Sequence, residues 1–526
     1  MMLSFIFLNL SPLLKEIESM SAKSMIIIGA GLAGLATGCY AQMNGYESKI
    51  FEHHSVAGGV AAVWRRRDYL IDGGIHFLIC HKPGTSIYEV YSEIGAVGSY
   101  EIADMTTYLR FIDETGTKSI EFTQDLEKLK KDLIALAPED TEEIRSFVKE
   151  IEWLKDSPLL TDLGMSSAPP ELKGRFDSLK EMWEMRSFMK YFTGKFATSA
   201  KVYAERNLKN PFLKTVINYL FSPDGPIWFV IMMLASVAAG QLGLFKRGCQ
   251  EFVQSIVQKY ESLGGQINYN ATVEKVIVEN DSAVGVLLTD GTEYRADIIV
   301  SAADGRSTIF EMLNGKYIDD KIEKRYKTWK PYDPMVVVSF GVNRTFDDEA
   351  PLTMFMMKRP LMYMGREIDC LPLRILNYGD EFAPEGKSVI QVMLETDWEP
   401  WFELRQDQEK YTAAKTEISA DILDRLEEHF PGMRSQVEVT DVATPYTSWR
   451  YTLNHKGSPM GWMLTKKTLT EVVPRTLPGL ENFYMAGHWV LPGGGVPGSI
   501  YTGRNVVQIL CKRDGMKFKT KLDVLS

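Results

Sequence analysis

The first strong pattern in the chain is a short apolar run, Met25 to Ile28, that leads directly into a glycine-rich turn. Consecutive apolar residues before such a turn indicate a strand buried on both faces. The small residues that follow predict a helix to about Met43, and Asn44-Gly45 supplies a signal for its end. Ser48 to Phe51 predicts the next strand, so the chain opens with a strand–helix–strand unit.

A second group of patterned segments lies in the middle of the chain. Apolar residues at helical spacing predict an amphipathic helix from Gln250 to Leu263, which Gly264-Gly265 would end. Segments rich in β-forming residues follow, and Asn280-Asp281 and Asp290-Gly291 are turn signals that predict a meander. Ile298 to Ala303 is a continuous apolar run, which is typical of a buried parallel strand.

The last patterned block lies near the carboxyl end. Phe483 to Ala486 predicts a short strand that ends in Gly487. A glycine-rich turn then precedes a helix that we expect from about Gly498, with its start near Val496. Strands of the buried parallel type are therefore predicted in three blocks that lie far apart in the sequence.

One long stretch, Gly225 to Phe245, contains no charged residue and just reaches the length of a bilayer span. Its strongly apolar part, Ile227 to Ala239, is too short for a span, and glycines interrupt the rest. We therefore expect a buried helix, with a helix that dips into one leaflet as the alternative. Residues 1–23 are expected to be a short extension, since no basic residue precedes their apolar part; an amphipathic membrane contact is the alternative.

The composition narrows the class of protein. A chain of 526 residues exceeds what one hydrophobic core usually supports, so we expect two domains. A net charge of −10 argues against nucleic acid as a partner, because phosphate neutralisation needs a basic face. The five cysteines are scattered without a CxxC pair, so neither a disulfide framework nor a metal site is expected, and the cytoplasm is the expected compartment.

The glycine-rich turn carries the clearest chemistry. Gly29, Gly31 and Gly34 form a GxGxxG that follows a predicted strand and opens a predicted helix, the context in which this motif binds a dinucleotide. The helix start, with Ala30, Leu32 and Ala33, would offer free N–H groups to phosphates. Glu52 ends the second strand, where a carboxylate can accept from both ribose hydroxyls and disfavours the 2′-phosphate of NADP.

Two further glycine pairs favour FAD over NAD. Gly58-Gly59 follows Glu52 after five residues, and Gly73-Gly74 lies in "YLIDGGIHFL". A nicotinamide domain has no special need for these glycines, whereas an extended FAD runs closely past the backbone. FAD is therefore the expected cofactor.

At this point the chain resembles a known family. The E-x5-GG that follows GxGxxG is similar to the extended motif of the flavin amine oxidase superfamily. The block Gly243 to Asp304, the segment "GSPMGW" from Gly457 to Trp462, and the C-terminal segment Leu477 to Leu510 look like those of phytoene desaturases and their relatives, including retinol-saturase-like proteins. The resemblance covers both ends and the middle of the chain, about half of it.

This resemblance implies an α/β fold, with a Rossmann-type (glutathione-reductase-like) FAD-binding domain and a second, mixed α+β substrate domain. The FAD-binding domain would be discontinuous, with residues 24–84, 243–325 and 470–518. Residues 85–242 and 326–469 would form the substrate domain, with apolar helices that could contact a membrane.

The resemblance also assigns site residues. The backbone at Val273 would hold the adenine, and the helix start near Val496 would face the flavin. His76 would lie near the isoalloxazine, where it could orient the ring or move a proton; a structural histidine is the alternative. The full set of expected cofactor-binding residues is Gly29, Ala30, Gly31, Leu32, Ala33, Gly34, Glu52, His53, Gly58, Gly59, Val60, Gly74, Ile75, His76, Val273, Ala303, Gly487, His488, Val496 and Pro497.

Two positions depart from the pattern. His488 stands where superfamily members usually carry Asp or Glu, although desaturase-type members often lack that acid. Val60 stands where a basic residue is common, and a side chain from Arg65 to Arg67 could replace its charge; a solvated basic turn is the alternative.

The segments outside the three blocks are rich in methionine and aromatic residues, which suits a long, hydrophobic ligand. The expected function is FAD-dependent desaturation of an isoprenoid or carotenoid-like lipid, with a diffusible partner such as a quinone, oxygen or NAD(P)H exchanging the electrons. Saturation or isomerisation of a polyene, or amine oxidation, are alternatives within enzymes. A prenyl-lipid-binding escort protein, which does no redox chemistry, is the non-enzyme alternative. We expect a monotopic, peripheral membrane contact at most.

Overall fold

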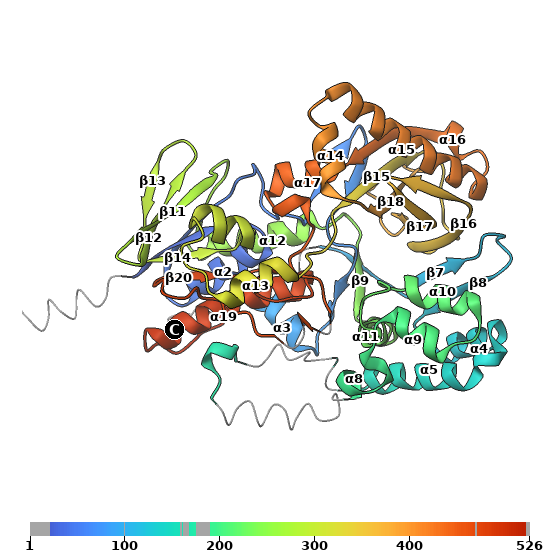
Figure 1. Cartoon of the computed structure of the whole chain (residues 1–526), viewed down its shortest axis with the longest axis horizontal. Helices are drawn as coiled ribbons and strands as arrows, with labels where there is room; N and C mark the ends of the chain where they lie inside the picture. Colours follow the sequence, from blue (N-terminus) through green and yellow to red (C-terminus); the bar gives the residue numbers. More distant parts are fainter. Residues whose placement is uncertain are drawn as a thin grey trace, which may run out of the picture.

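The structure is a computed structural model that describes residues 22–98, 100–157, 160, 168–174, 190–465, 467–468 and 471–521. It has the two-lobed α/β architecture that the sequence predicts. The first lobe, here called the dinucleotide lobe, is built on a five-stranded parallel sheet (Figure 1). The order of its strands is β10 (Gln266–Asn268), β2 (Glu47–Phe51), β1 (Ser24–Ile28), β14 (Ile298–Ser301) and β20 (Phe483–Met485).

Strand β1 shows why the sheet is sandwiched between two layers. Met25 and Ile27 belong to one hydrophobic core, and Ile26 and Ile28 belong to another. Side chains alternate across a strand, so a continuous apolar run must be covered on both faces. The first core contains residues of helices α2 (Leu32–Met43), α12 (Gln250–Ser262) and α19 (Gly495–Arg513), among others. The second contains residues of β11 (Val273–Glu279) and β12 (Ser282–Leu288), and the exposed strand β13 (Glu293–Arg295) completes the meander.

The core of the dinucleotide lobe continues past residue 84, where we expected the first segment of this domain to end. Thr85 caps helix α3 (Ser86–Glu93) by accepting a hydrogen bond from the backbone N–H of Tyr88. Ile87, Val90 and Tyr91 of this helix pack into the same core as α2 and α12. The apolar face of α3 therefore belongs to this lobe.

The second lobe, here called the distal lobe, contains a seven-stranded mixed sheet. Its strands are β19 (Val437–Ala443), β15 (Met335–Val342), β18 (Ser388–Glu395), β17 (Arg366–Ile375), β16 (Leu352–Tyr363), β7 (Thr107–Ile112) and β8 (Ser119–Thr123), in that order. Helix α15 (Gln408–His429) packs on the core formed by the central strands. A second block of helices lies beside the β7 end (Figure 1): α4 (Leu126–Leu136), α5 (Thr141–Lys155), α8 (Lys190–Thr193), α9 (Ala200–Asn207), α10 (Pro211–Tyr219) and α11 (Ile227–Ala238).

Short elements connect the two lobes. The hairpin β3 (Val63–Arg66) and β4 (Tyr69–Asp72) leaves the dinucleotide lobe towards the distal sheet. A three-stranded sheet of β5 (Leu78–Ile79), β9 (Leu242–Phe245) and β6 (Ile102–Asp104) lies between them. The other α-helices in the described residues are α13 (Asp320–Thr328), α14 (Trp398–Leu404), α16 (Met433–Gln436) and α17 (Pro445–Thr452).

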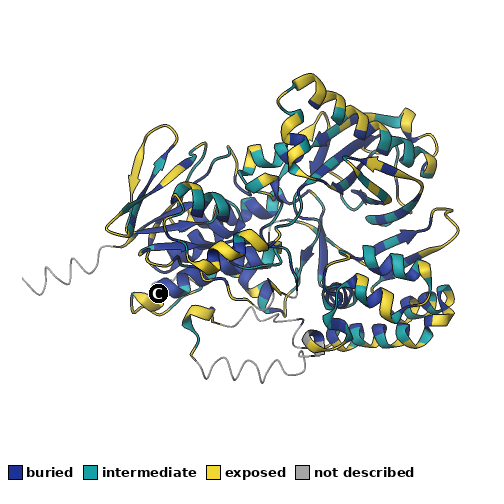
Figure 2. Cartoon of the chain, viewed as in Figure 1, coloured by how far each residue is buried: buried dark blue, intermediate teal, exposed yellow. Residues whose placement is uncertain are grey.

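The uncharged segment is a buried helix, as expected, but a shorter one. Helix α11 ends at Ala238, Gly240 adopts a positive φ of 65°, and the residues from Leu242 to Phe245 form strand β9. Ile227 and Ile231 are fully buried in the helical core of the distal lobe, as the dark interior in Figure 2 illustrates. Of the helices in the described part of the chain, none combines the length and apolar character that crossing a bilayer requires.

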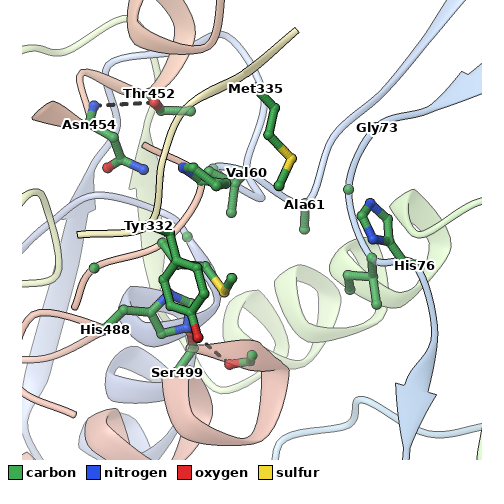
Figure 3. A pocket seen from close by; sticks show the side chains of 18 of the residues that line it. Val60, Ala61, Gly73, His76, Tyr332, Met335, Thr452, Asn454, His488 and Ser499 are labelled. Carbon is green, nitrogen blue, oxygen red and sulfur yellow. Dashed lines mark hydrogen bonds between the residues drawn. The ribbon is translucent and has the colours of Figure 1, made fainter. Parts of the chain in front are cut away.

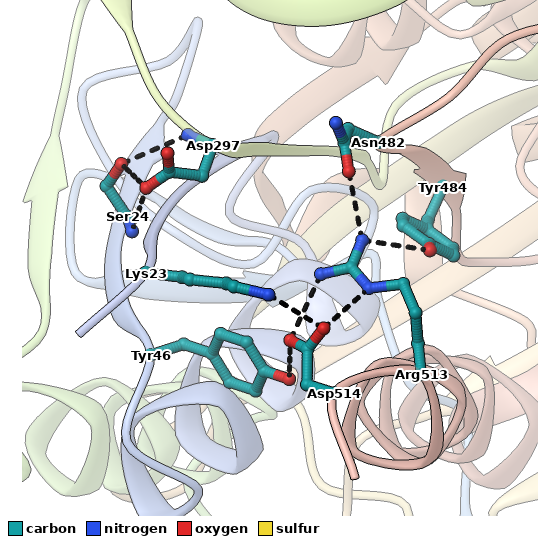
Figure 4. Close-up of polar contacts among 8 residues, drawn as sticks. All are labelled: Lys23, Ser24, Tyr46, Asp297, Asn482, Tyr484, Arg513 and Asp514. Carbon is teal, nitrogen blue, oxygen red and sulfur yellow. Dashed lines mark hydrogen bonds and ion pairs between the residues drawn. The ribbon is translucent and has the colours of Figure 1, made fainter. Parts of the chain in front are cut away.

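A polar cluster closes the amino-terminal edge of the parallel sheet (Figure 4). Asp514, just after α19, accepts from Lys23 Nζ at 2.8 Å, from Tyr46 Oη at 2.9 Å and from Arg513 Nε at 2.9 Å. Ser24 at the start of β1 donates through its hydroxyl to Asp297, just before β14, at 2.7 Å. Hydrogen bonds thus join residues near the two ends of the described chain, at the edge of the sheet where the strands begin.

Candidate cofactor site and adjoining cavity

The opposite edge of the parallel sheet carries the site. Gly29 follows β1, Glu52 follows β2, Ala303 lies just beyond β14, and Gly487 lies just beyond β20. Ligands of open α/β sheets bind outside the carboxyl ends of the strands, where the connections diverge. All four residues line one cavity of about 1260 Å³. Three blocks that are distant in sequence therefore meet at a single site.

The glycine turn has the geometry that a phosphate group needs. Gly29 has a φ of +94°, and its N–H donates to Phe51 O at 2.8 Å. A Cβ at Gly34 would overlap the carbonyl oxygen of Gly29, whereas a Cβ at Gly31 would meet nothing within 4 Å. Gly31 begins helix α2 without a side-chain cap. The N–H groups of the first turn are therefore directed at an open part of the cavity.

Glu52 is held rigidly at the end of β2. Its Oε2 accepts from Ala30 N at 2.6 Å and its Oε1 accepts from His54 N at 2.8 Å, and the residue is 6% exposed. Burial raises the pKa of Glu52, and these two backbone donors oppose that rise. Each carboxylate oxygen keeps a lone pair for a further donor. His53, in contrast, binds the protein through both ring nitrogens, to Thr272 Oγ1 at 2.8 Å and Arg450 O at 3.0 Å.

The loop after Glu52 lies against the glycine turn. Gly58 N donates to Ala30 O at 2.9 Å, and Gly58 adopts a φ of +128°. Gly59 and Val60 line the cavity beside it. None of Arg65, Arg66 and Arg67 lines the cavity, which disfavours an arginine as the replacement for a basic residue at Val60. Arg66 pairs with Asp441 at 2.6 Å, and Arg67 donates to Glu438 O at 3.0 Å. Both partners belong to β19 of the distal lobe.

The segment Gly73 to His76 lies directly beside the cavity and lines it. A Cβ at Gly74 would lie 2.6 Å from Cys249 Sγ and 2.9 Å from the Cα of Ala61, so only glycine fits. Ile75 and His76 line the cavity. Burial lowers the pKa of His76 to about 3, and the nearby Arg374 guanidinium adds to this effect. The imidazole is therefore neutral at physiological pH.

The carboxyl-terminal part of the site surrounds His488. Gly487 N donates to Thr502 Oγ1 at 2.8 Å, while His488 Nε2 contacts Gly495 O at 3.0 Å and the hydroxyl of Ser499. Burial lowers the pKa of His488. In Figure 3, His488 and Ser499 lie on the opposite side of the drawn site from His76. Helix α19 begins at Gly495, close to the predicted start.

Seventeen of the twenty expected cofactor-binding residues line the cavity; Ala30, Gly34 and Pro497 do not. The N–H of Ala30 is used by Glu52, and Gly34 serves the close packing of α2 on the glycine turn. The described ranges contain no group of three His, Cys, Asp or Glu side chains placed to hold a metal ion.

From the flavin-type site the cavity continues into the distal lobe. There it is lined by Leu109, Phe229, Leu352 and Met354, among other apolar residues. Methionines recur along the cavity as a whole: Met312, Met335, Met354, Met393, Met460 and Met463. Flexible, polarisable side chains of this kind adapt to irregular hydrophobic ligands.

Sequence reasoning missed two buried charged residues of this cavity. Asp304, just after β14, is 2% exposed and accepts from Ser307 N at 2.8 Å and His455 N at 2.9 Å. Burial raises the pKa of Asp304 to about 6. Arg374, on β17, is 4% exposed. Its signal was available, because it is the one charged residue in the otherwise uncharged run from Cys370 to Asn377.

Comparison with known proteins gives one family model, two similar relatives and one similar solved structure. A family model described as flavin containing amine oxidoreductase matches residues 32–511. Prolycopene isomerase, chloroplastic, of Arabidopsis thaliana is 23% identical over 516 residues, which cover 95% of this chain and 84% of the relative. Phytoene desaturase (lycopene-forming) of a Paracoccus species is 23% identical over 514 residues, which cover 94% and 98% of the two chains. A solved structure of an oxidoreductase from Methanosarcina mazei has a TM-score of 0.58 at 17% identity and covers 92% of this chain and all of its own.

Proposed function

The chain belongs to the flavin containing amine oxidoreductase family, whose cofactor is FAD, and from this premise we propose that it desaturates a long hydrophobic lipid of the isoprenoid or carotenoid type. The observation that carries the proposal is the continuity of one cavity from the glycine turn at Gly31 to the apolar residues around Met354. A cofactor site that opens into a hydrophobic channel suits a substrate without charged groups.

The residues present fit FAD. The open space at Gly31, the uncapped start of α2 and the buried carboxylate of Glu52 would hold the pyrophosphate and ribose. The cavity of about 1260 Å³ exceeds the roughly 300–1,000 Å³ of a typical single-ligand pocket, so it has room for a cofactor and a substrate. Bound FAD supplies a hydride acceptor at N5 of its ring.

The chain's own residues would position the substrate and exclude water. Leu352 and Met354 line the cavity from β16, and Phe229 lines it from α11. Hydrocarbon side chains of this kind hold a polyene by its surface, and holding the reacting carbon in place lowers the barrier to hydride removal. The sequence offers no second GxGxxG that directly follows a predicted strand and could hold a resident nicotinamide nucleotide, so a quinone, oxygen or NAD(P)H would exchange electrons by diffusion.

His76 is the side chain we propose to act nearest the reacting atoms, as a neutral hydrogen-bonding group. A group with a pKa of about 3 is not an imidazolium donor at neutral pH. We expect His76→Gln, which keeps one hydrogen-bonding nitrogen, to lower kcat by about 10-fold or less, below the usual 10²–10⁴-fold of acid–base catalysts. The kcat profile between pH 5 and 8 should have the same shape in both proteins.

The control is His455→Gln, because His455 lies outside the cavity lining and its pKa is also lowered, to about 4. It should leave kcat unchanged. A wild-type step near pH 6–7 that disappears in His76→Gln would contradict the neutral role of His76.

Isomerisation is the second candidate function, because one relative at 23% identity is a prolycopene isomerase. The same hydrophobic cavity would serve isomerisation, saturation or desaturation, and these differ in the hydrogen balance of the product. Amine oxidation is less well matched to the apolar lining of the distal cavity. A cofactor-free escort role is disfavoured by the intact glycine turn and by Glu52.

The test is anaerobic incubation of the FAD-loaded protein with polyprenoid and carotenoid lipids, followed by mass spectrometry. A product lighter by two hydrogens from the oxidised flavoprotein supports desaturation, and one heavier by two from the flavoprotein first reduced with dithionite supports saturation. Equal mass with altered retention supports isomerisation. If no polyprenoid changes while a primary or secondary amine bleaches the flavin absorbance near ~450 nm, the lipid assignment is wrong.

A further inference from the structure

Arg374 is a buried cation that joins the two lobes beneath the segment Gly73–His76. It lies on β17 of the distal sheet, 4% exposed, and it lines the cavity. Its Nη1 donates to Asp72 O at 2.7 Å, and its Nη2 makes a longer contact of 3.5 Å with Ile75 O. The guanidinium therefore holds the backbone on both sides of the Gly73-Gly74 pair.

Further contacts fix the guanidinium itself. Nη1 also donates to Gln391 Oε1 at 3.1 Å, and Nη2 donates to Tyr378 Oη at 2.9 Å. Gln391 in turn donates to Ser339 Oγ at 3.3 Å. These partners come from the distal sheet and from the segment just after β17, so the orientation of the arginine is set by the distal lobe.

The counter-charge comes from the dinucleotide lobe. Asp72, 1% exposed, has its Oδ2 3.7 Å from Arg374 Nη2. Its Oδ1 accepts from Gly74 N at 3.0 Å, and its Oδ2 accepts from Cys249 N at 3.1 Å. An ion pair buried this deeply is costly to desolvate and is a weak source of stability. Arg374 Nε also has no hydrogen-bond partner among the described residues.

The pair is better explained by what it holds in place. Through Asp72 and Ile75 it fixes the strip of backbone that passes the cavity next to His76. No hydrogen bond is formed by the main-chain N–H of His76 in the described part of the chain. Ile75 O and the N–H of His76 belong to the same peptide group, and in a trans peptide the two point in opposite directions. Because Ile75 O faces Arg374, the N–H of His76 points away from Arg374.

We propose that Arg374 is a positioning residue for the flavin ring: it orients the Gly73–His76 backbone against the ring, and its charge favours the electron-rich, reduced state of the cofactor. The inference rests on FAD occupying the site, not on the lipid substrate. A fixed cation in a water-excluded site stabilises negative charge more than the same cation in water. The role of the charge and the role of the geometry are separable, because lysine keeps the first and loses the second.

The experiment compares Arg374→Met and Arg374→Lys with the wild type in two readouts, the dissociation constant of FAD from the apoprotein and the reduction potential of the bound flavin. Arg374→Met should weaken FAD binding by about 10-fold or more and shift the potential to more negative values, because it also leaves Asp72 as an unpaired buried carboxylate. Arg374→Lys should weaken FAD binding but keep the potential close to that of the wild type.

Arg475→Met is the matched control. Arg475 is also a buried arginine, with 3% of its side chain exposed, it pairs with Glu171 at 3.1 Å, and it lies outside the cavity lining. Its loss should lower the melting temperature while leaving FAD affinity and potential unchanged. If Arg374→Met does not fold, the double variant Asp72→Asn/Arg374→Met removes both charges and is measured instead. Wild-type affinity and potential in whichever variant folds, or equal changes in Arg475→Met, would overturn the proposal.

Discussion

Replacement of Gly31 by valine is expected to abolish FAD binding while the protein still folds. Gly31 has an ordinary extended backbone, with φ −69° and ψ 175°, and a Cβ there meets nothing within 4 Å. The valine methyl groups would therefore enter the cavity without disturbing the protein. They would occupy the space in which we place the pyrophosphate, next to the first turn of α2. We expect FAD affinity to fall by at least about 100-fold, which is about 2.7 kcal/mol.

The measurement is titration of the apoprotein with FAD, together with a thermal melt of the apoprotein. Gly34→Ala provides the contrast, because its Cβ would overlap Gly29 O and the helix could not pack on the turn. That variant should lose the fold as well as the cofactor. Wild-type FAD affinity in Gly31→Val would show that the phosphates lie elsewhere.

Replacement of Met354 by tryptophan is expected to block conversion of a long lipid while FAD remains bound. Met354 lines the distal part of the cavity from β16, and the larger indole would fill the channel. Displacement of a substrate by about 1 Å is enough to cost on the order of 100-fold in rate, so we expect kcat/KM to fall by at least that factor. The flavin spectrum should be unchanged, because the glycine turn is not touched.

The control lies on the same strand. Met362 is 65% exposed and does not line the cavity, so Met362→Trp should behave as the wild type. Equal kcat/KM values in Met354→Trp and the wild type would mean that the substrate does not pass through the distal lobe. The comparison uses the lipid that gives a product in the proposed assay.

The elements around the glycine turn could be predicted closely, because their signals are local. The end of α2 at Met43 follows from Asn44-Gly45, with Gly45 at a φ of +80°. The three meander strands follow from the two turns between them. The uncharged segment was predicted less well. Its apolar composition extends to Phe245, and the change from helix to strand depends on the backbone at Gly240 and on pairing with β5 and β6.

The distal lobe could not be predicted in the same way, because its order depends on pairings between distant strands. Strand β16 pairs in parallel with β7, with Thr353 opposite Arg110. Nothing in either strand's sequence specifies the other, and the pairing is decided by how both bury their apolar faces. The contact between Arg374 and Asp72 likewise joins residues 302 positions apart. The lone charge in an apolar run marked Arg374 as unusual, but its partner is visible only in the folded protein.

Lys23, just before β1, donates a hydrogen bond to Asp514, just after α19, although the two residues are 491 positions apart. This separation has a consequence for the synthesis of the protein. At about 5–20 residues per second, a ribosome needs tens of seconds after β1 has emerged to deliver β20 and α19. During that interval β14 lacks its partner β20, and α2 lacks the helix α19 with which it shares a core, so apolar surface of this lobe is open to chaperones or to aggregation. The site includes Gly487, just after β20, and Val496 of α19, so it is complete only after these two late elements have joined the sheet.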